Sequence, residues 1–459
     1  MDEGLLLSYP ELVRRGAQPG IDFIYPYGPA GLQVLGLFYR LLGVSLTVER
    51  VVGLAYRLAL IGALYAATRR THNPAAIVGA IFAGWMIAPL GLGAFAWFGG
   101  IAALVASMAL LVHAAPGRSS GRLVGAGVLL GIALDFRADL AIPVALVAVA
   151  GLRRRDTRAH LAFAGAAFVG ALPLVRLALS IGVREMWRSM VREPAARAPA
   201  HLLPFPPRGP ALLLFATVTF AAVLVAFGVP LVRALRARAV DDALAPQLML
   251  GAVAVALLPQ LVQRADVSHI ICVAVVAVPA GLAQLATLAR RPSRALLPHA
   301  FAAFVVFAGN PRTMFAPLVE ASGVPVTVAG RTFLVDDPAH ARELTEALGE
   351  LETRAADGES LFVGASDPRF MHYNDCFIYA LTPKLRAASY YVAVVPGTTV
   401  AAADVERADW LLLTTYYDTS FSAMEWTDER RAFVRAVEAH CLVGRHGKYD
   451  LWRRCSRGG

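Results

Sequence analysis

The stretch "PALLLFATVTFAAVLVAFGVPLVRALRAR" (residues 210–238) decides the fold class. Its first 23 residues carry no charge, and three arginines follow within the next six positions. A helix needs about 20 apolar residues to cross the roughly 30 Å hydrocarbon core of a bilayer. The stretch therefore predicts a transmembrane helix that ends in a basic loop.

Similar apolar segments recur along the first 309 residues. We expect ten membrane spans, at 51–68, 75–92, 97–115, 121–135, 138–152, 160–181, 210–235, 243–262, 268–288 and 294–309. The whole chain is 57% hydrophobic and 17% charged, whereas about 25% of residues are charged in a soluble domain. The sequence thus predicts a mainly α-helical, polytopic membrane bundle.

Basic loops occupy alternate connections between these segments, at 68–72, 116–122, 152–158, 232–238 and 289–294. Cytoplasmic loops of membrane proteins are enriched in Lys and Arg. We therefore expect these five loops in the cytoplasm, and the N-terminal loop and everything after residue 309 on the outer side. Because the loops account for the net charge of +10, that charge does not indicate a nucleic-acid partner.

From residue 320 the pattern changes to short apolar strands alternating with amphipathic helices. This alternation predicts a small soluble α/β domain. We divide the chain into a first outer loop with juxtamembrane helices (1–50), the helical bundle (51–309) and the outer α/β domain (320–459). Cys441 and Cys455 flank a turn in this domain, and the sequence leaves open whether they form a disulfide.

Several motifs near the N-terminus precede the bundle: "DEG" (2–4), "YPELVRRG" (9–16), "DFIYPYGP" (22–29) and Arg50. Together with the bundle, they resemble the first outer loop of GT-C membrane glycosyltransferases, the superfamily of protein O-mannosyltransferases and lipid A aminoarabinose transferases. In that family a transmembrane helix precedes the acidic pair, so we expect one upstream of Met1.

The resemblance implies an integral membrane glycosyltransferase of the bacterial plasma membrane. Such an enzyme takes a sugar from a polyprenyl-phosphate donor and transfers it to a glycan, lipid or protein acceptor at the extracytoplasmic face. The acceptor hydroxyl loses its proton while positive charge develops at the anomeric carbon. Asp2 is the candidate general base and Glu3 a positioning residue or metal ligand; alternatively, the two acids are simply exposed and solvated.

Several members of the family carry a second acid in the second outer loop, but residues 88–100 contain none. Asp139 is the candidate for that role. It belongs to "LDFRADLAI" (134–142), where Asp135 and Arg137 also interrupt an apolar hairpin. Ionisable groups at bilayer depth are costly, so these three predict an ion-pair network or a polar site; a turn at the membrane surface is the alternative.

A further charged group lies in "PQLVQRADVSHI" (259–270). The expected ligands of the donor phosphate are Arg264, His269, Arg137 and Arg184, the last on an amphipathic interfacial helix. The expected additional polar groups are Asp22, Asp135 and Asp266. No cofactor is certain; a divalent cation (Mg²⁺ or Mn²⁺) stays open, although one Asp beside one His is a weak metal motif.

Two other classes of function fit part of the sequence. A lipid-linked sugar flippase predicts inverted repeats and a charged cavity near the midplane, and the sequence contains no such repeat. A non-catalytic subunit of an envelope assembly complex predicts that Asp2→Asn leaves the phenotype intact.

Overall fold

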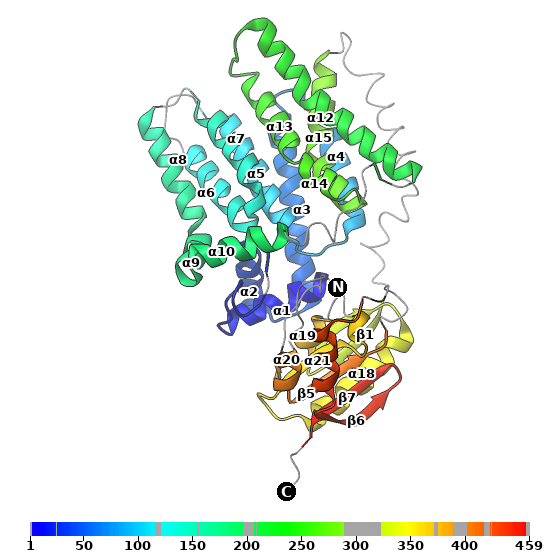
Figure 1. Ribbon diagram of the computed structural model, residues 1–459. Coiled ribbons are helices and arrows are strands. Elements are labelled where there is room, and N and C mark those ends of the chain that lie inside the picture. The colour runs from blue at the N-terminus through cyan, green and yellow to red at the C-terminus, as the bar shows by residue number, and fades with distance from the viewer. Residues whose placement is uncertain are drawn as a thin grey trace. The chain divides into compact units, whose positions relative to one another are not determined.

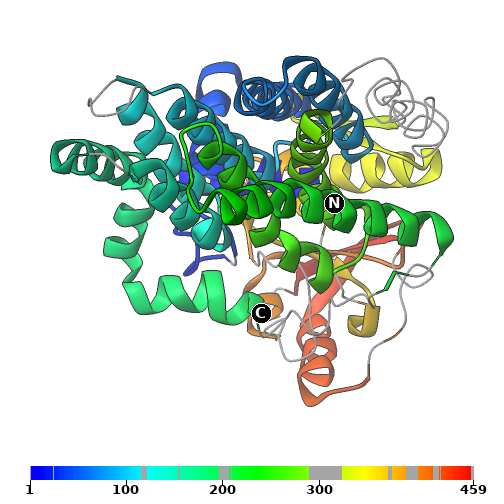
Figure 2. The same cartoon turned by 90° about the horizontal axis from the view of Figure 1, so that it is seen from above.

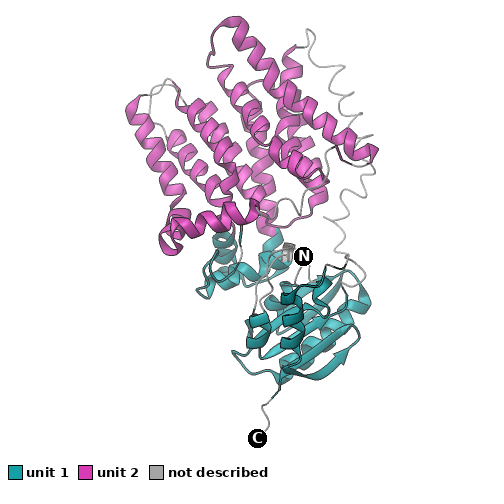
Figure 3. Ribbon diagram, viewed as in Figure 1, with its two compact units in different colours: residues 1–26, 32–50, 321–459 teal, residues 27–31, 51–320 magenta. Residues whose placement is uncertain are grey.

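The fold was analysed in a computed structural model of the chain (Figure 1). It describes residues 2–23, 25–114, 121–153, 156–195, 206–207, 209–288, 323–370, 375–388, 402–416, 423 and 425–455, without the side chains of Asp2 and Glu3. The chain forms two compact units (Figure 3). The first comprises residues 1–26, 32–50 and 321–459, and the second comprises residues 27–31 and 51–320.

The second unit is a helical bundle. Its helices are α3 (Leu46–Thr68, which begins in the first unit), α4 (Asn73–Ile87), α5 (Ala96–His113), α6 (Gly121–Phe136), α7 (Ala141–Leu152), α8 (Thr157–Gly170), α9 (Leu172–Ile181), α10 (Val183–Trp187), α12 (Pro210–Ala237), α13 (Ala245–Ala256), α14 (Leu258–Gln263) and α15 (Val267–Leu288). Short 3₁₀ turns cover Ala88–Leu90 and Ala138–Leu140, and a π-helical turn covers Arg188–Arg192. Helix α12 packs on α15, which also packs on α4 (Figure 1, Figure 2).

Fewer helices than the expected ten are long and apolar enough to cross a membrane. Among the described residues six qualify, or seven if α8 and α9, bent by 58° at their junction, form one span. The expected spans at 121–135 and 138–152 are apolar helices of less than the required length, and the segment 294–309 lies outside the described residues. The chain is an integral membrane protein.

Glycines bring α6 and α8 into close contact. An ideal Cβ on Gly131 of α6 would lie 2.0 Å from the carbonyl oxygen of Ala167, and one on Gly170 would lie 2.0 Å from that of Val128. Small residues spaced four apart, such as Gly127 and Gly131, let helix backbones approach in membranes, where packing rather than water exclusion drives association. This contact fixes the helix whose end carries Asp135 and Arg137.

The C-terminal part of the first unit contains an antiparallel hairpin and a mixed sheet. The strands are β1 (Val324–Val328), β2 (Arg331–Val335), β3 (Ser360–Ala365), β4 (Arg386–Ala387), β5 (Trp410–Thr414), β6 (His440–His446) and β7 (Tyr449–Arg454). The helices are α18 (Pro338–Arg354), α19 (Phe377–Leu381), α20 (Ala402–Arg407) and α21 (Asp428–Val437), with a 3₁₀ turn at Pro368–Phe370. The sheet order is β4-β3-β5-β7-β6, with β3 parallel to β4 and β5 and antiparallel pairing beyond β5.

The N-terminal helices α1 (Asp2–Arg14) and α2 (Ala30–Leu42) precede the bundle. Helix α1 packs against α19 within the first unit. Glu11 forms ion pairs with Arg14 at 2.7 Å and with Arg331 of β2 at 3.9 Å. Burial raises the pKa of Glu11, but the arginines outweigh it and the pKa is lowered overall. The helix that begins at Asp2 is thus attached to the C-terminal domain by a charged network.

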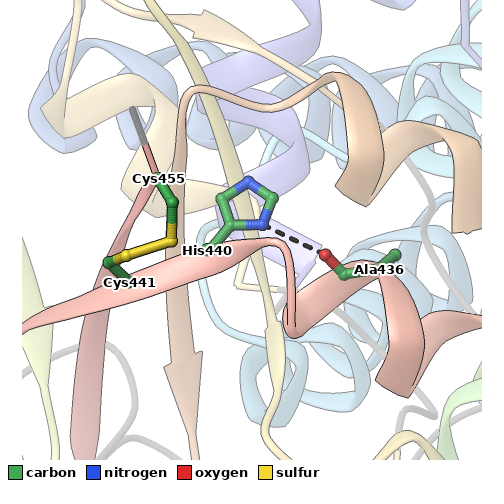
Figure 4. Close-up of a disulfide and its surroundings, with 4 residues drawn as sticks. All are labelled: Ala436, His440, Cys441 and Cys455. Carbon is green, nitrogen blue, oxygen red and sulfur yellow. Dashed lines mark hydrogen bonds between the residues drawn. A yellow bond between two sulfur atoms is a disulfide. The ribbon is translucent and has the colours of Figure 1, made fainter. Parts of the chain in front are cut away.

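Cys441 and Cys455 form a disulfide between the start of β6 and the residue after β7, with a Cα–Cα distance of 5.1 Å (Figure 4). The neighbouring His440 is buried, and its ring nitrogens lie 3.1 Å from the carbonyl oxygen of Ala436 and 2.9 Å from that of Ala408. The bond that the sequence left open is therefore present, and it closes the edge hairpin of the sheet.

Candidate active site

The charged residues at the end of α6 form a closely bonded group. Arg137 donates to both carboxylate oxygens of Asp139, at 2.8 and 2.6 Å. Gln260 of α14 donates to the same carboxylate at 2.7 Å. Of the three residues expected to form an ion-pair network, Arg137 and Asp139 are paired, and Gln260, more than a hundred residues away in sequence, joins this pair.

Tyr27 lies over this group because its loop approaches α6 very closely. The N–H of Gly28 donates to the carbonyl oxygen of Phe136 at 3.0 Å, and an ideal Cβ on Gly28 would lie 1.9 Å from the carbonyl oxygen of Asp135. Only glycine fits such a backbone approach. The guanidinium of Arg137 lies 5.1 Å from the centre of the Tyr27 ring, within cation–π distance.

A second charged group is centred on Asp266, just before α15. Its Oδ1 accepts the backbone N–H of His269 at 3.0 Å and lies 2.8 Å from the Nδ1 of the same residue. Its Oδ2 forms an ion pair with Nε of Arg264 at 2.7 Å. Burial raises the pKa of Asp266, but the bonds from His269 and the charge of Arg264 outweigh it and lower the pKa to about 2. Asp266 is thus a permanent anion that caps a helix and holds two basic side chains.

The remaining donors of these basic side chains are free within the described part of the chain. There the terminal nitrogens of Arg264 and the Nε2 of His269 have no bonded partner. The Arg264 side chain is 41% exposed and that of His269 31%. Cys272, one turn further along α15, is within electrostatic range of Arg137, Asp139 and Asp266, so the two charged groups lie near each other.

The other expected site residues have different surroundings. Asp22 is exposed in the loop after α1, where its Oδ2 accepts the N–H of Gln18 at 2.7 Å. Asp135 is 2% exposed, and its Oδ1 has no hydrogen-bond partner among the described residues. Arg184 lies on the five-residue helix α10, which ends at the exposed Trp187. The side chains of Asp2 and Glu3, the expected base and its neighbour, lie outside the described part.

Within the described residues no three His, Cys, Asp or Glu side chains converge as metal ligands would. The Asp266–His269 pair supplies two such groups at most. The side chains of Asp2 and Glu3 are not among these residues.

Sequence reasoning missed Tyr27 and Gln260. Tyr27 lies in a motif that was quoted, but a loop tyrosine gives no local signal of its partner. Gln260 is a polar residue between apolar residues of α14. A polar side chain inside an apolar helix often marks a functional position, and this was the only sequence signal for Gln260.

Comparison with known proteins supports the fold. Neither a protein-family model nor a curated protein matches the sequence. The solved structure of ArnT from Cupriavidus metallidurans bound to undecaprenyl phosphate is similar, with 14% identity, coverage of 100% of this chain and 94% of that chain, and a TM-score of 0.58. Its apo state matches with 15% identity, 98% and 92% coverage, and a TM-score of 0.51. The chain therefore has the fold of this ArnT over its full length, in agreement with the resemblance noted in the sequence.

Proposed function

We propose that this protein is a glycosyltransferase that moves a sugar from a polyprenyl-phosphate donor to a glycan, lipid or protein acceptor. The observation that carries the proposal is the full-length fold similarity to a protein whose structure holds undecaprenyl phosphate. The bundle also presents basic side chains at the connections that the sequence predicts to be outside. A lipid phosphate at a membrane surface needs such donors.

In this proposal Arg264 and His269 bind the donor phosphate. Asp266 occupies one nitrogen of each, and the remaining donors have no partner within the described residues. An arginine already held by a carboxylate is pre-organised, so less side-chain entropy is lost when the ligand binds. Arg137 uses two nitrogens on Asp139 and acts mainly as a positioning residue, and Arg184 on the interfacial helix is a weaker candidate.

Asp2 is the proposed general base. As the acceptor oxygen bonds to the anomeric carbon, its proton passes to the Asp2 carboxylate, and the bond from that carbon to the phosphate oxygen breaks. Polyprenyl phosphate leaves with the electron pair of that bond. Glu3 positions the acceptor, and Asp139 positions Arg137 rather than taking a proton, because its carboxylate already accepts three hydrogen bonds.

The reaction is proposed to occur at the extracytoplasmic face of the bacterial plasma membrane. Two features support this side. Arginine-rich loops occupy the alternate connections expected in the cytoplasm. The disulfide of the C-terminal domain is of a kind that persists in oxidising compartments.

The test is a transfer assay in membranes with a panel of radiolabelled polyprenyl-phosphate sugars. Asp2→Asn should abolish transfer at equal expression, and Arg264→Gln should raise the KM for the donor at least tenfold. Arg236→Gln, which removes an exposed arginine of α12 outside these groups, serves as the matched control. Equal turnover by Asp2→Asn would remove Asp2 from the mechanism and shift attention to Asp139. Absence of turnover with every donor would favour the flippase or the non-catalytic subunit.

A further inference from the structure

Two neighbouring cavities lie in the helical bundle, at the end where several arginine-bearing connections meet. The smaller has a volume of about 330 Å³; four charged residues line it, Arg70, Arg153, Asp241 and Asp242, and its other lining residues are apolar or glycine. The larger has a volume of about 750 Å³ and is lined mainly by apolar side chains of α7, α12 and α13, together with Arg153 and His160. Arg153 lines both cavities. A charged compartment and an apolar compartment therefore meet at one arginine.

The charged cavity carries two guanidinium groups and two carboxylates. Arg70 donates to the carbonyl oxygen of Val112 at the end of α5. The Oδ1 of Asp241 accepts the N–H of Leu244 at 2.7 Å in the turn before α13. These bonds fix both side chains and leave their charges in place. Arg153, by contrast, is exposed and has no bonded partner among the described residues.

The apolar cavity has the character of a lipid-facing groove. Leu146 and Val149 of α7 and Leu248 and Ala252 of α13 line it, and Phe227 of α12 completes it. Val149 is 74% exposed, which an apolar side chain in a membrane bundle tolerates because it contacts acyl chains. The volume lies in the range of about 300–1,000 Å³ that is usual for small-molecule sites. The groove is thus suited to a hydrocarbon chain.

We propose that the two cavities together bind one phospholipid whose headgroup carries both a phosphate and a primary ammonium group, as in phosphatidylethanolamine. The phosphate lies against Arg153, the ammonium donates to Asp242, and one acyl chain fills the apolar cavity. Charge complementarity selects this headgroup, because two cations and two anions line the cavity. An anionic headgroup such as phosphatidylglycerol has no positive charge to pair with the two carboxylates. A choline group is positively charged but has no N–H to donate to these carboxylates. The site is independent of sugar transfer.

Native mass spectrometry of the purified full chain in detergent tests the proposal, with defined phosphatidylethanolamine, phosphatidylglycerol and phosphatidylcholine added. Wild-type protein should retain phosphatidylethanolamine most strongly. Arg153→Gln should weaken that binding about fivefold, the usual effect of one basic residue at a membrane surface. Asp242→Asn should remove the preference over phosphatidylglycerol. Arg236→Gln, at an exposed arginine that lines neither cavity, should change nothing.

A second variant tests the groove itself. Ala252→Trp fills the apolar cavity and leaves Arg153 and Asp242 unchanged, so it should weaken lipid binding through the loss of the acyl-chain site alone. If this variant aggregates, Val149→Gln, at an exposed position of the same cavity, is used in its place. Equal binding of the three lipids, unchanged binding by Arg153→Gln, or a preference for polyprenyl phosphate in direct competition would each overturn the proposal. No transfer is measured, so these outcomes are separate from a failure of the proposed enzymatic function.

Discussion

The charge of Asp266 should stabilise the fold through a mechanism that one substitution isolates. Asp266→Asn keeps an oxygen that can accept the N–H of His269, so the cap of α15 is retained. It removes the negative charge that pairs with Arg264 and the His269 ring. Any loss of stability in this variant therefore reports the charge rather than the cap.

The magnitude follows from the lowered pKa of Asp266. The pKa falls from 3.8 to about 2 on folding, and each unit corresponds to about 1.4 kcal/mol. The upper limit is thus about 2.5 kcal/mol. Because the side chain is 24% exposed and asparagine keeps the backbone bond, we expect a loss of about 1–2 kcal/mol at pH 7. Since the folded-state pKa is the lower one, this stabilisation is complete above about pH 4 and is lost as the pH falls through about 2.

Thermal unfolding followed by tryptophan fluorescence in detergent measures the difference. At pH 7 the midpoint should fall by about 2–4 °C, and at pH 3 the gap between wild type and variant should be about half as large. Asp156→Asn is the matched control, because Asp156 caps α8 through Ala159 and has no ion pair in the described part of the chain. A variant as stable as wild type at pH 7, or a gap that stays constant to pH 3, would refute the reasoning.

Two further predictions concern backbone geometry and the C-terminal domain. Gly28→Ala should reduce sugar transfer at least tenfold in the membrane assay, because its Cβ would collide with the carbonyl oxygen of Asp135 and displace the loop of Tyr27; transfer at the wild-type rate would contradict this geometry. Cys441→Ser should lower the unfolding free energy of the C-terminal domain by about 3 kcal/mol, given the short loop that the bond closes. Reductant should lower the melting point of the wild type and leave this variant unchanged, and an equal response of both proteins would show that the bond does not form.

Local patterns predicted most secondary structure in the C-terminal domain. The segments "SLFVGA" and "YDLWRR" form the strands β3 and β7 of the expected alternation of strands and helices. The side chain of Thr427 accepts the N–H of Arg430 at 3.2 Å and so caps the start of α21. These features depend on side-chain alternation and capping, which act within a few residues. Strand β6 lacks such a local pattern, because "HCLVGRH" mixes polar and apolar residues and is defined by its pairing with β7.

The sequence identified individual residues of the site, but it did not predict all of the hydrogen-bond partners of these residues. The sequence selected Arg137 and Asp139 together, and the structure bonds them directly. The third member, Gln260, lies 121 positions beyond Asp139. Hydropathy fixes which segments are helices, but the packing of α6 and α14 that brings these ends together depends on side-chain shape. The expected ten spans are supported in part: six or seven described helices are long and apolar enough to cross a membrane, whereas the helix around α7 is apolar but shorter.

The alternation of charge along the sequence nevertheless carries three-dimensional information. A helix that crosses a membrane delivers the chain to the opposite side, so every second connection lies at the same end of a bundle. The charged cavity brings together Arg70, Arg153 and Asp241, which belong to or directly follow three of the expected cytoplasmic connections. Asp139, in an expected outer connection, bonds to Gln260, which lies near the end of the expected span 243–262 and close to the next outer connection. The short and bent helices therefore still carry the chain from one end of the bundle to the other. For this reason the positions of the arginines in the sequence indicate where both groups of charged residues lie, although the number of full-length spans does not.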